Sequence, residues 1–166
     1  MKKFLSGCFL LILLACSGSK ETPAEVYDLS FTCPAGWTVS EQEDYGDSKY
    51  MSIEKEGFSS SGIVMITYAN EEFELTDYLD IHKESYKEQK IFSNIKFNLV
   101  KDSSYGQYDG ILAEYRVSVM SVAHVGRMYV FHAKGKTICV TEQEAVEDSA
   151  KNKTGFEKIR ETFLVR

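Results

Sequence analysis

The sequence predicts a single α+β domain, an antiparallel β-sheet sandwiched by helices. Most of the chain beyond residue 27 alternates apolar and polar side chains with the two-residue period of strands, and two segments break that period with helical spacing. Turn sequences such as Asp109-Gly110 and Lys134-Gly135 separate the alternating runs, as is typical of antiparallel hairpins. We therefore expect one domain of about 140 residues, an ordinary size for a chain with its own core.

Five runs of residues predict strands. The clearest lies at residues 111–119, where apolar side chains share one face and Glu114, Arg116 and Ser118 lie on the other. Residues 63–68 are apolar on both faces, as in a central strand that is covered on both sides. The five expected strands cover residues 51–53, 63–68, 95–99, 111–119 and 128–133.

Two segments predict helices. Residues 75–90 contain no strong turn former, and Thr76 or Asp77 offers an N-cap. The apolar face of this helix would consist of Tyr78, Leu79, His82 and Tyr86. Residues 154–157 have the Thr-x-x-Glu spacing of a capping box, so we expect the last helix to begin there. Its buried face would carry Phe156, Ile159 and Phe163.

The N-terminal segment resembles a bacterial lipoprotein signal peptide. Lys2 and Lys3 precede an apolar run that is too short to span a bilayer, and the run ends in Leu13-Leu14-Ala15-Cys16, the pattern of a lipobox. The resemblance implies cleavage before Cys16 and acylation of that cysteine, which together give stable membrane anchoring. A cleaved secretory signal with an incidental cysteine and an uncleaved membrane anchor are the alternatives.

These features define the expected organisation of the chain. Residues 1–15 would be the signal peptide, residues 16–26 a small, polar, lipid-bearing tether, and residues 27–166 the folded domain. No aspartate follows Cys16, which in the enteric sorting pattern favours the outer membrane. We therefore expect a cell-envelope protein that is anchored by its N-terminal lipid and faces the periplasm or the cell surface.

The charge balance argues against nucleic acid as a partner. The chain has 19 lysines and arginines against 25 aspartates and glutamates, a net charge of −6 that becomes more negative once Lys2 and Lys3 are removed. A nucleic-acid-binding domain needs a basic surface. An acidic surface instead keeps a tethered domain away from anionic lipid headgroups.

Cys33 and Cys139 are the cysteines of the expected domain. A disulfide between them would be compatible with an oxidising envelope and would close a long loop. Two separate buried thiols, packing as small apolar side chains, are the alternative. The spacing of the two residues does not decide between these arrangements.

No constellation of residues predicts catalysis. His82, His124 and His132 lack the short spacing of metal ligands, so we expect no metal site. The serines at residues 59–61 lack the glycine pattern of a nucleophile elbow, and no motif implies a cofactor. The sequence therefore favours a protein that is not an enzyme. Asp148-Ser149-Ala150 matches a bacterial O-glycosylation acceptor, in which Ser149 would carry the glycan.

Residues 31–37, Phe-Thr-Cys-Pro-Ala-Gly-Trp, resemble the opening strand and Pro-x-Gly-Trp turn of PsbP-like and DcrB-like domains. A helix at 75–90, a long hairpin that begins at Gly110 and a closing helix at 156–163 follow in the same order, so the resemblance covers about residues 27–164. It implies an α-β-α arrangement and a non-catalytic accessory role. Such roles include photosystem II support in one branch, binding of a small GTPase in another and envelope lipoproteins in a third. The resemblance brings no catalytic residue with it.

We therefore expect an envelope lipoprotein that acts as a non-catalytic accessory or protein-binding factor. Tyrosines are enriched at protein interfaces, and four lie in or beside expected loops at one end of the sheet: Tyr45, Tyr50, Tyr105 and Tyr108. Packing of these tyrosines on their own loops is the alternative. A small-ligand-binding or sensing domain is the second expectation, and it requires a pocket between sheet and helix with converging polar groups.

Overall fold

The computed structural model describes residues 20–57 and 61–166, so the expected signal peptide and Cys16 lie outside the described residues. The described residues form one α+β domain, as predicted. A small sheet consists of β1 (Thr22–Val26), β2 (Leu29–Cys33) and β11 (Leu164–Val165). A large sheet consists of β3 (Trp37–Asp44), β4 (Ser48–Lys55), β5 (Ile63–Ala69), β6 (Phe92–Phe97), β7 (Lys101–Tyr105), β8 (Tyr108–Val119), β9 (Val122–Ala133) and β10 (Lys136–Ala145). The helices are α1 (Leu75–Glu88), the short 3-10 turn η1 (Val146–Asp148) and α2 (Ser149–Thr162).

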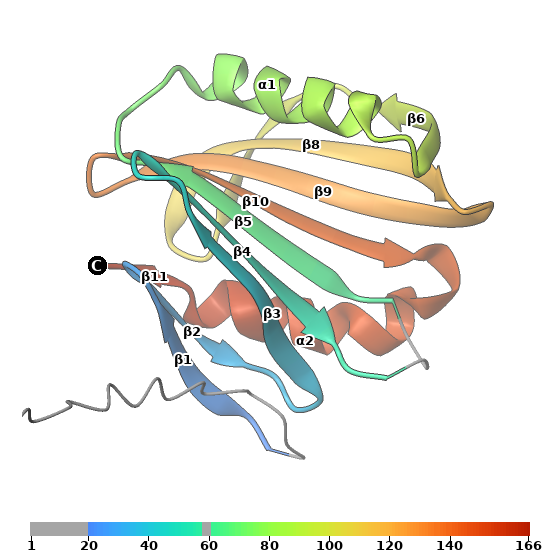
Figure 1. The fold of residues 1–166 in the computed structure, drawn as a ribbon, viewed down its shortest axis with the longest axis horizontal. Coiled ribbons are helices and arrows are strands. Elements are labelled where there is room, and N and C mark those ends of the chain that lie inside the picture. Colours follow the sequence, from blue (N-terminus) through green and yellow to red (C-terminus); the bar gives the residue numbers. More distant parts are fainter. Residues whose placement is uncertain (1–19, 58–60) are drawn as a thin grey trace, which may run out of the picture.

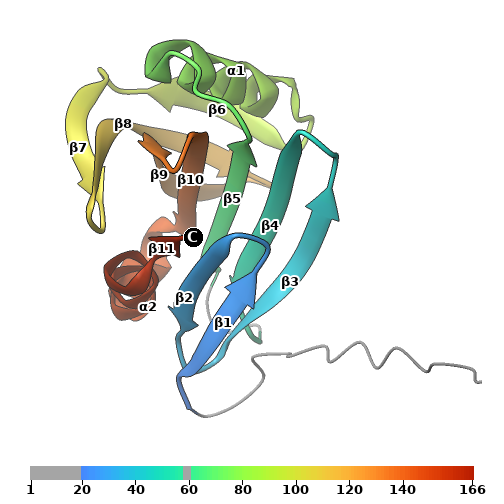
Figure 2. The same ribbon diagram turned by 90° about the vertical axis from the view of Figure 1, so that its left-hand side faces the viewer.

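The large sheet is antiparallel throughout its described strands, in the order β3-β4-β5-β10-β9-β8-β6, and β7 pairs with the first half of β8. Figure 1 shows α1 on one face of this sheet and α2 on the other. In Figure 2 the small sheet lies on the same side as α2. The sheet is therefore sandwiched by helices, which confirms the predicted fold class.

Each face of the large sheet has its own apolar core. The core under α1 includes Leu79, Tyr86 and Met128. The core under α2 gathers aromatic side chains from both sheets, from α2 and from the chain end, namely Phe31, Trp37, Phe131, Phe156 and Phe163. Burial of one such side chain contributes roughly 1.5–3 kcal/mol, so these two clusters supply much of the force that holds the layers together.

The five predicted strands are confirmed as parts of β4, β5, β6, β8 and β9, with β6 lying slightly earlier in the chain than expected. β5 lies between β4 and β10, as its apolar faces indicated. Alternation predicted strands such as β8 correctly because they have one face in a core, whereas β5 was predicted from a run that is apolar on both faces.

Residues 22–26 belong to the domain and not to a tether, so the expected boundary at residue 27 is wrong. They form β1, which pairs with β2 and buries Ala24 and Val26. β1 is an edge strand, a position that accommodates Pro23 because no neighbour needs its missing backbone N–H. The polar residues around Pro23 conceal this strand in the sequence.

α1 begins at Leu75, as the expected range 75–90 does, but its N-cap differs from the predicted residues, and α2 begins earlier than predicted. Glu74 precedes α1 at the N-cap position, so Thr76 and Asp77 lie inside that helix. α2 already begins at Ser149, and the capping-box sequence at 154–157 therefore lies within it. The Asp148 carboxylate accepts hydrogen bonds from residues 61 and 151 instead of capping the helix. Neither α1 nor α2 is long and apolar enough to cross a membrane, and the same holds for the rest of the described chain.

Cys33 and Cys139 are not joined by a disulfide, so the second of the two sequence-based alternatives is correct. Cys33 packs in the core under α2, whereas Cys139 packs in the core under α1, on the opposite face of the sheet. The Cys33 thiol donates to the carbonyl oxygen of Trp37 at 3.3 Å. Burial raises the pKa of the Cys139 thiol to about 12, which keeps it protonated and unreactive.

Candidate functional site

Charged side chains gather on one part of the sheet face that α2 covers. Side chains alternate along each strand, so residues paired in register lie side by side on the same face. One such row crosses three strands, from Glu114 on β8 through Arg127 on β9 to Glu142 on β10. The next row on this face is Arg116, Val125 and Glu144. Most side chains in these two rows are therefore charged, whereas the rest of this sheet face carries an apolar core.

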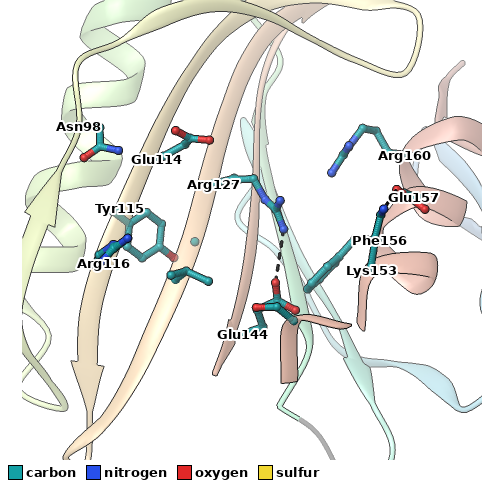
Figure 3. Close-up of a pocket in the computed structure, with 13 residues that line it drawn as sticks. Asn98, Glu114, Tyr115, Arg116, Arg127, Glu144, Lys153, Phe156, Glu157 and Arg160 are labelled. Carbon is teal, nitrogen blue, oxygen red and sulfur yellow. Dashed lines mark ion pairs between the residues drawn. The ribbon is translucent and has the colours of Figure 1, made fainter. Parts of the chain in front are cut away.

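α2 lies beside these rows and completes a groove of about 440 Å³, which Figure 3 shows in close-up. Asn98, just after β6, forms part of the opposite rim. The residues that α2 contributes are Ser149, Lys153, Phe156, Glu157 and Arg160. This volume lies within the range of ligand sites, roughly 300–1,000 Å³, and its position between sheet and helix is the one that the second functional expectation requires.

Glu142 lies beneath the groove as a buried carboxylate shared by two arginines. Its side chain is 0% exposed, and Arg160 donates hydrogen bonds to its two oxygens at 2.8 and 2.7 Å. The Nε atom of Arg127 lies 3.2 Å from the same carboxylate. Burial raises the pKa of Glu142, although both arginines oppose this shift. Burial lowers the pKa of Arg160, but the charge and hydrogen bonds of Glu142 outweigh this, so that pKa is raised.

Glu144 is nearly as deeply buried as Glu142 and has a weaker partner. Its side chain is 4% exposed, and its Oε1 lies 3.5 Å from Nη2 of Arg127, the ion pair marked in Figure 3. Its Oε2 has no hydrogen-bond partner among the described residues. Arg127 also packs over the ring of Phe156, with 5.8 Å between the guanidinium carbon and the ring centroid, which holds the guanidinium at the groove. Buried carboxylate oxygens almost always accept hydrogen bonds. Glu144 could therefore accept a hydrogen bond from a donor group of a ligand at the floor of the groove.

The structure does not bring the four candidate tyrosines together. Tyr45 and Tyr50 lie on the hairpin of β3 and β4, whereas Tyr105 and Tyr108 lie on the hairpin of β7 and β8 at the other edge of the sheet. Tyr45 is exposed and Tyr50 is half-buried.

Tyr105 cannot contact a partner, so the expectation for this residue is wrong. It is 1% exposed, and its ring packs against Tyr129 and Phe163 at centroid distances of 5.2 and 5.3 Å. Tyr108 is half-buried beside this cluster, and its hydroxyl accepts a hydrogen bond from the Val165 backbone N–H at 2.9 Å. Both residues therefore follow the alternative reading, in which they pack within their own domain.

The remaining candidates lie apart from one another. Ser149 is the first residue of α2 and lines the groove. This position does not test its glycosylation, which stays a prediction. His82 packs against Tyr78 on α1, and His132 contacts the carbonyl oxygen of Phe73 at 2.8 Å. Within residues 20–57 and 61–166, no three His, Cys, Asp or Glu side chains lie together as metal ligands would.

Apart from Ser149, the sequence-based candidates did not include the residues that line the groove or lie beneath it. Glu142 and Glu144 lie in the run Thr-Glu-Gln-Glu at 141–144, which is typical of a solvated loop. One signal could have found them: the alternation of Ile138 and Val140 continues onto Glu142 and Glu144, which places both carboxylates on the buried face of a strand.

The fold has known counterparts, although no family model and no curated protein sequence matches this chain. Cyanobacterial PsbP (CyanoP) from Synechocystis sp. PCC 6803 is similar over 89% of this chain and 94% of its own, with a TM-score of 0.58 and 15% identity. LpqN, involved in cell envelope biogenesis of Mycobacterium tuberculosis, is similar over 87% of this chain and 90% of its own, with a TM-score of 0.55 and 9% identity. The Saccharomyces cerevisiae Ran-binding protein Mog1p is similar over 89% of this chain and 96% of its own, with a TM-score of 0.54 and 8% identity. The chain therefore has the Mog1/PsbP-like fold, which agrees with the PsbP resemblance of the sequence.

Proposed function

We propose that this chain is a membrane-anchored envelope lipoprotein that acts as a non-catalytic binding factor for another envelope protein, through the groove beside α2. The convergence of charged side chains from β8, β9, β10 and α2 on this groove carries the proposal. Arginine is enriched at protein interfaces, and a groove with both signs of charge can select a partner segment of complementary pattern. The Ran-binding protein Mog1p shares the fold, which supports binding, and so does LpqN, which is involved in cell envelope biogenesis and supports the proposed location.

The residues of the groove support binding in preference to turnover. A catalytic site needs a nucleophile, a base and a group that orients the base. The described residues that line the groove include no histidine, cysteine or aspartate, and none of the described hydrogen bonds joins their one serine, Ser149, to a lysine or glutamate that could act as its base. The arginines and glutamates instead form ion pairs with each other, a pattern that positions a bound surface without activating a nucleophile.

The anchor is tested by feeding cells radiolabelled palmitate. The wild-type chain should become labelled because Cys16 ends the lipobox, and Cys16→Ser should not. Cys8→Ser provides the matched control and should keep the label. Label retained by Cys16→Ser would remove the lipid anchor from the proposal.

The binding surface is tested with a photoreactive amino acid at one of two positions. Glu157 at the groove and Lys87 on α1 have similarly exposed side chains, 45% and 46%, on opposite faces of the sheet. A probe at position 157 should form a crosslink with an envelope protein in intact cells, whereas a probe at 87 should not. Crosslinks at 87 alone, or equal crosslinks at both positions, would contradict the groove as the binding surface.

Binding of a small ligand is the second candidate function. The observation that favours it is the Glu144 carboxylate, which lies at the floor of a groove of ligand size and leaves one buried oxygen without a hydrogen bond.

A further inference from the structure

Most charged residues that line the groove are already paired within the domain. The described ion pairs are Glu114 with Lys101 at 3.3 Å, Lys153 with Glu157 at 3.8 Å, Arg160 with Glu142 at 2.7 Å and Arg127 with Glu142 and Glu144 at 3.2 and 3.5 Å. Arg116 is the exception, because none of the described hydrogen bonds or ion pairs involves this exposed side chain. A positive charge is therefore available at the groove.

A negative charge is available to a ligand at Glu144. One of its oxygens has a single contact, at 3.5 Å, and the other has no hydrogen bond among the described residues. A carboxylate this deeply buried gains most from a charged donor, because hydrogen bonds between ionised groups are about twice as strong as those between neutral groups.

Arg116 and Glu144 lie in one register row, two strands apart. Both are paired with Val125, which stands between them on β9 and gives the floor an apolar centre. Adjacent strands are about 4.8 Å apart, so the two backbone positions are separated by roughly 10 Å. Figure 3 shows both side chains at the sheet side of the groove.

From this arrangement we infer that the groove binds a small zwitterion, a short peptide whose carboxylate pairs with Arg116 and whose ammonium group pairs with Glu144. Two or three residues at about 3.3–3.6 Å each match the separation of the two backbone positions that carry these charges. A small apolar side chain would lie over Val125. The inference rests on the proposal that the groove is the binding surface, and it names the chemistry that this surface recognises.

Other ligand classes fit the groove less well. A polyanion would meet Glu144, Glu114 and Glu157 in addition to the basic residues. A neutral sugar would leave the charges of Arg116 and Glu144 without counter-charges. A zwitterion satisfies both residues at once.

The test measures the binding of trialanine to the full chain in detergent by isothermal titration calorimetry. Trialanine should bind at least about tenfold more tightly than N-acetyl-trialanine or trialanine amide, since each capped peptide loses one of the two ionic hydrogen bonds. Equal binding of all three peptides, or no binding of trialanine, would overturn the inference. Preference for maltose over trialanine would overturn it as well.

Two variants assign the two ends of the peptide. Glu144→Gln should remove the penalty for N-acetylation and keep the penalty for amidation, whereas Arg116→Gln should do the reverse. Lys87→Gln, an exposed change on α1, should leave both penalties unchanged. Because Arg116 is exposed, its variant keeps the test decisive even where the change at buried Glu144 lowers stability. Loss of both penalties in both variants would contradict the assigned orientation.

The outcome separates this inference from the function on which it rests. Capture of an envelope protein by the probe at position 157, combined with no binding of trialanine, would refute the zwitterion and leave the binding function in place. Absence of both signals would refute both.

Discussion

Tyr115 on β8 lies directly opposite Gly126 on β9, and its ring occupies the space that a side chain at 126 would need. A Cβ atom at position 126 would stand 2.2 Å from Cζ of Tyr115. The ring is anchored beyond this point, because the Tyr115 hydroxyl donates to Gln143 on β10 at 2.8 Å. Gly126 therefore allows one aromatic side chain to reach across three strands beneath α1.

Gly126→Ala should lower the free energy of unfolding by about 1–3 kcal/mol, the usual cost of overpacking a core. In a Tyr115→Leu background the same change should cost clearly less, because the ring that collides with the new methyl group is gone. Urea unfolding of the wild type and the three variants measures the difference. An equal cost in both backgrounds would show that Tyr115 is not the obstacle.

Phe163→Ala should destabilise the domain by about 3–5 kcal/mol, because this buried ring packs against Tyr105, Tyr108 and Phe131. The neighbouring Leu164 provides a matched control. Its side chain is 48% exposed, so Leu164→Ala should cost no more than about 0.5 kcal/mol. Chemical denaturation measures both, and similar losses would contradict the assignment of Phe163 to the core.

Arg160→Met should destabilise the domain by about 3–5 kcal/mol, because it leaves the Glu142 carboxylate buried beside Arg127 alone. Arg160→Met combined with Glu142→Leu should recover part of this loss, since no buried carboxylate then remains at 142. Arg166→Met serves as the surface control and should cost little. A double variant less stable than Arg160→Met would argue against this account.

His82 should make the stability of the domain depend on pH. Burial lowers its pKa from 6.5 to about 4, so the unfolded chain takes up a proton over a range in which the folded chain does not. The free energy of unfolding should therefore be unaffected by His82 above about pH 7. It should fall by up to about 3 kcal/mol as the pH falls from 7 towards 4, because protonation of His82 then favours the unfolded chain. His82→Gln should flatten the stability curve over this range, and His132→Gln, an exposed change, should not. Unchanged pH dependence in His82→Gln would show that other groups cause it.

The fold class could be predicted because its strands and helices bury one face each. Residues 111–119 alternate without interruption, and Phe156, Ile159 and Phe163 mark the buried side of the last helix and the residue that follows it. The start of α2 could not be predicted from a cap, because the Asp148 carboxylate accepts hydrogen bonds from Ser61, which is distant in sequence, and from Lys151 instead of capping the helix. β1 was missed for a related reason: only its pairing with β2 makes such a short polar segment a strand.

The site could not be predicted, because its key residues violate the rule that charges lie outside. Glu142 is buried only because Arg127 and Arg160, which lie 15 and 18 residues away in the sequence, neutralise it. Tyr105 shows the opposite case, since it looks like an exposed loop residue until β8, β9 and the chain end pack around it. The burial of Glu142 and of Tyr105 depends on contacts between segments that are distant in the sequence, and the sequence pattern does not reveal such contacts.

The position of β1 sets the length of chain between the proposed lipid anchor at Cys16 and the domain. β1 begins at Thr22, so only residues 17–21 separate Cys16 from the first strand, and Glu21 already pairs with Lys158 of α2 at 3.2 Å. Five fully extended residues reach at most about 18 Å. With Cys16 lipidated as proposed, the protein would search for its partner in two dimensions, within a thin layer above the headgroups, and would meet only molecules that come down to that layer.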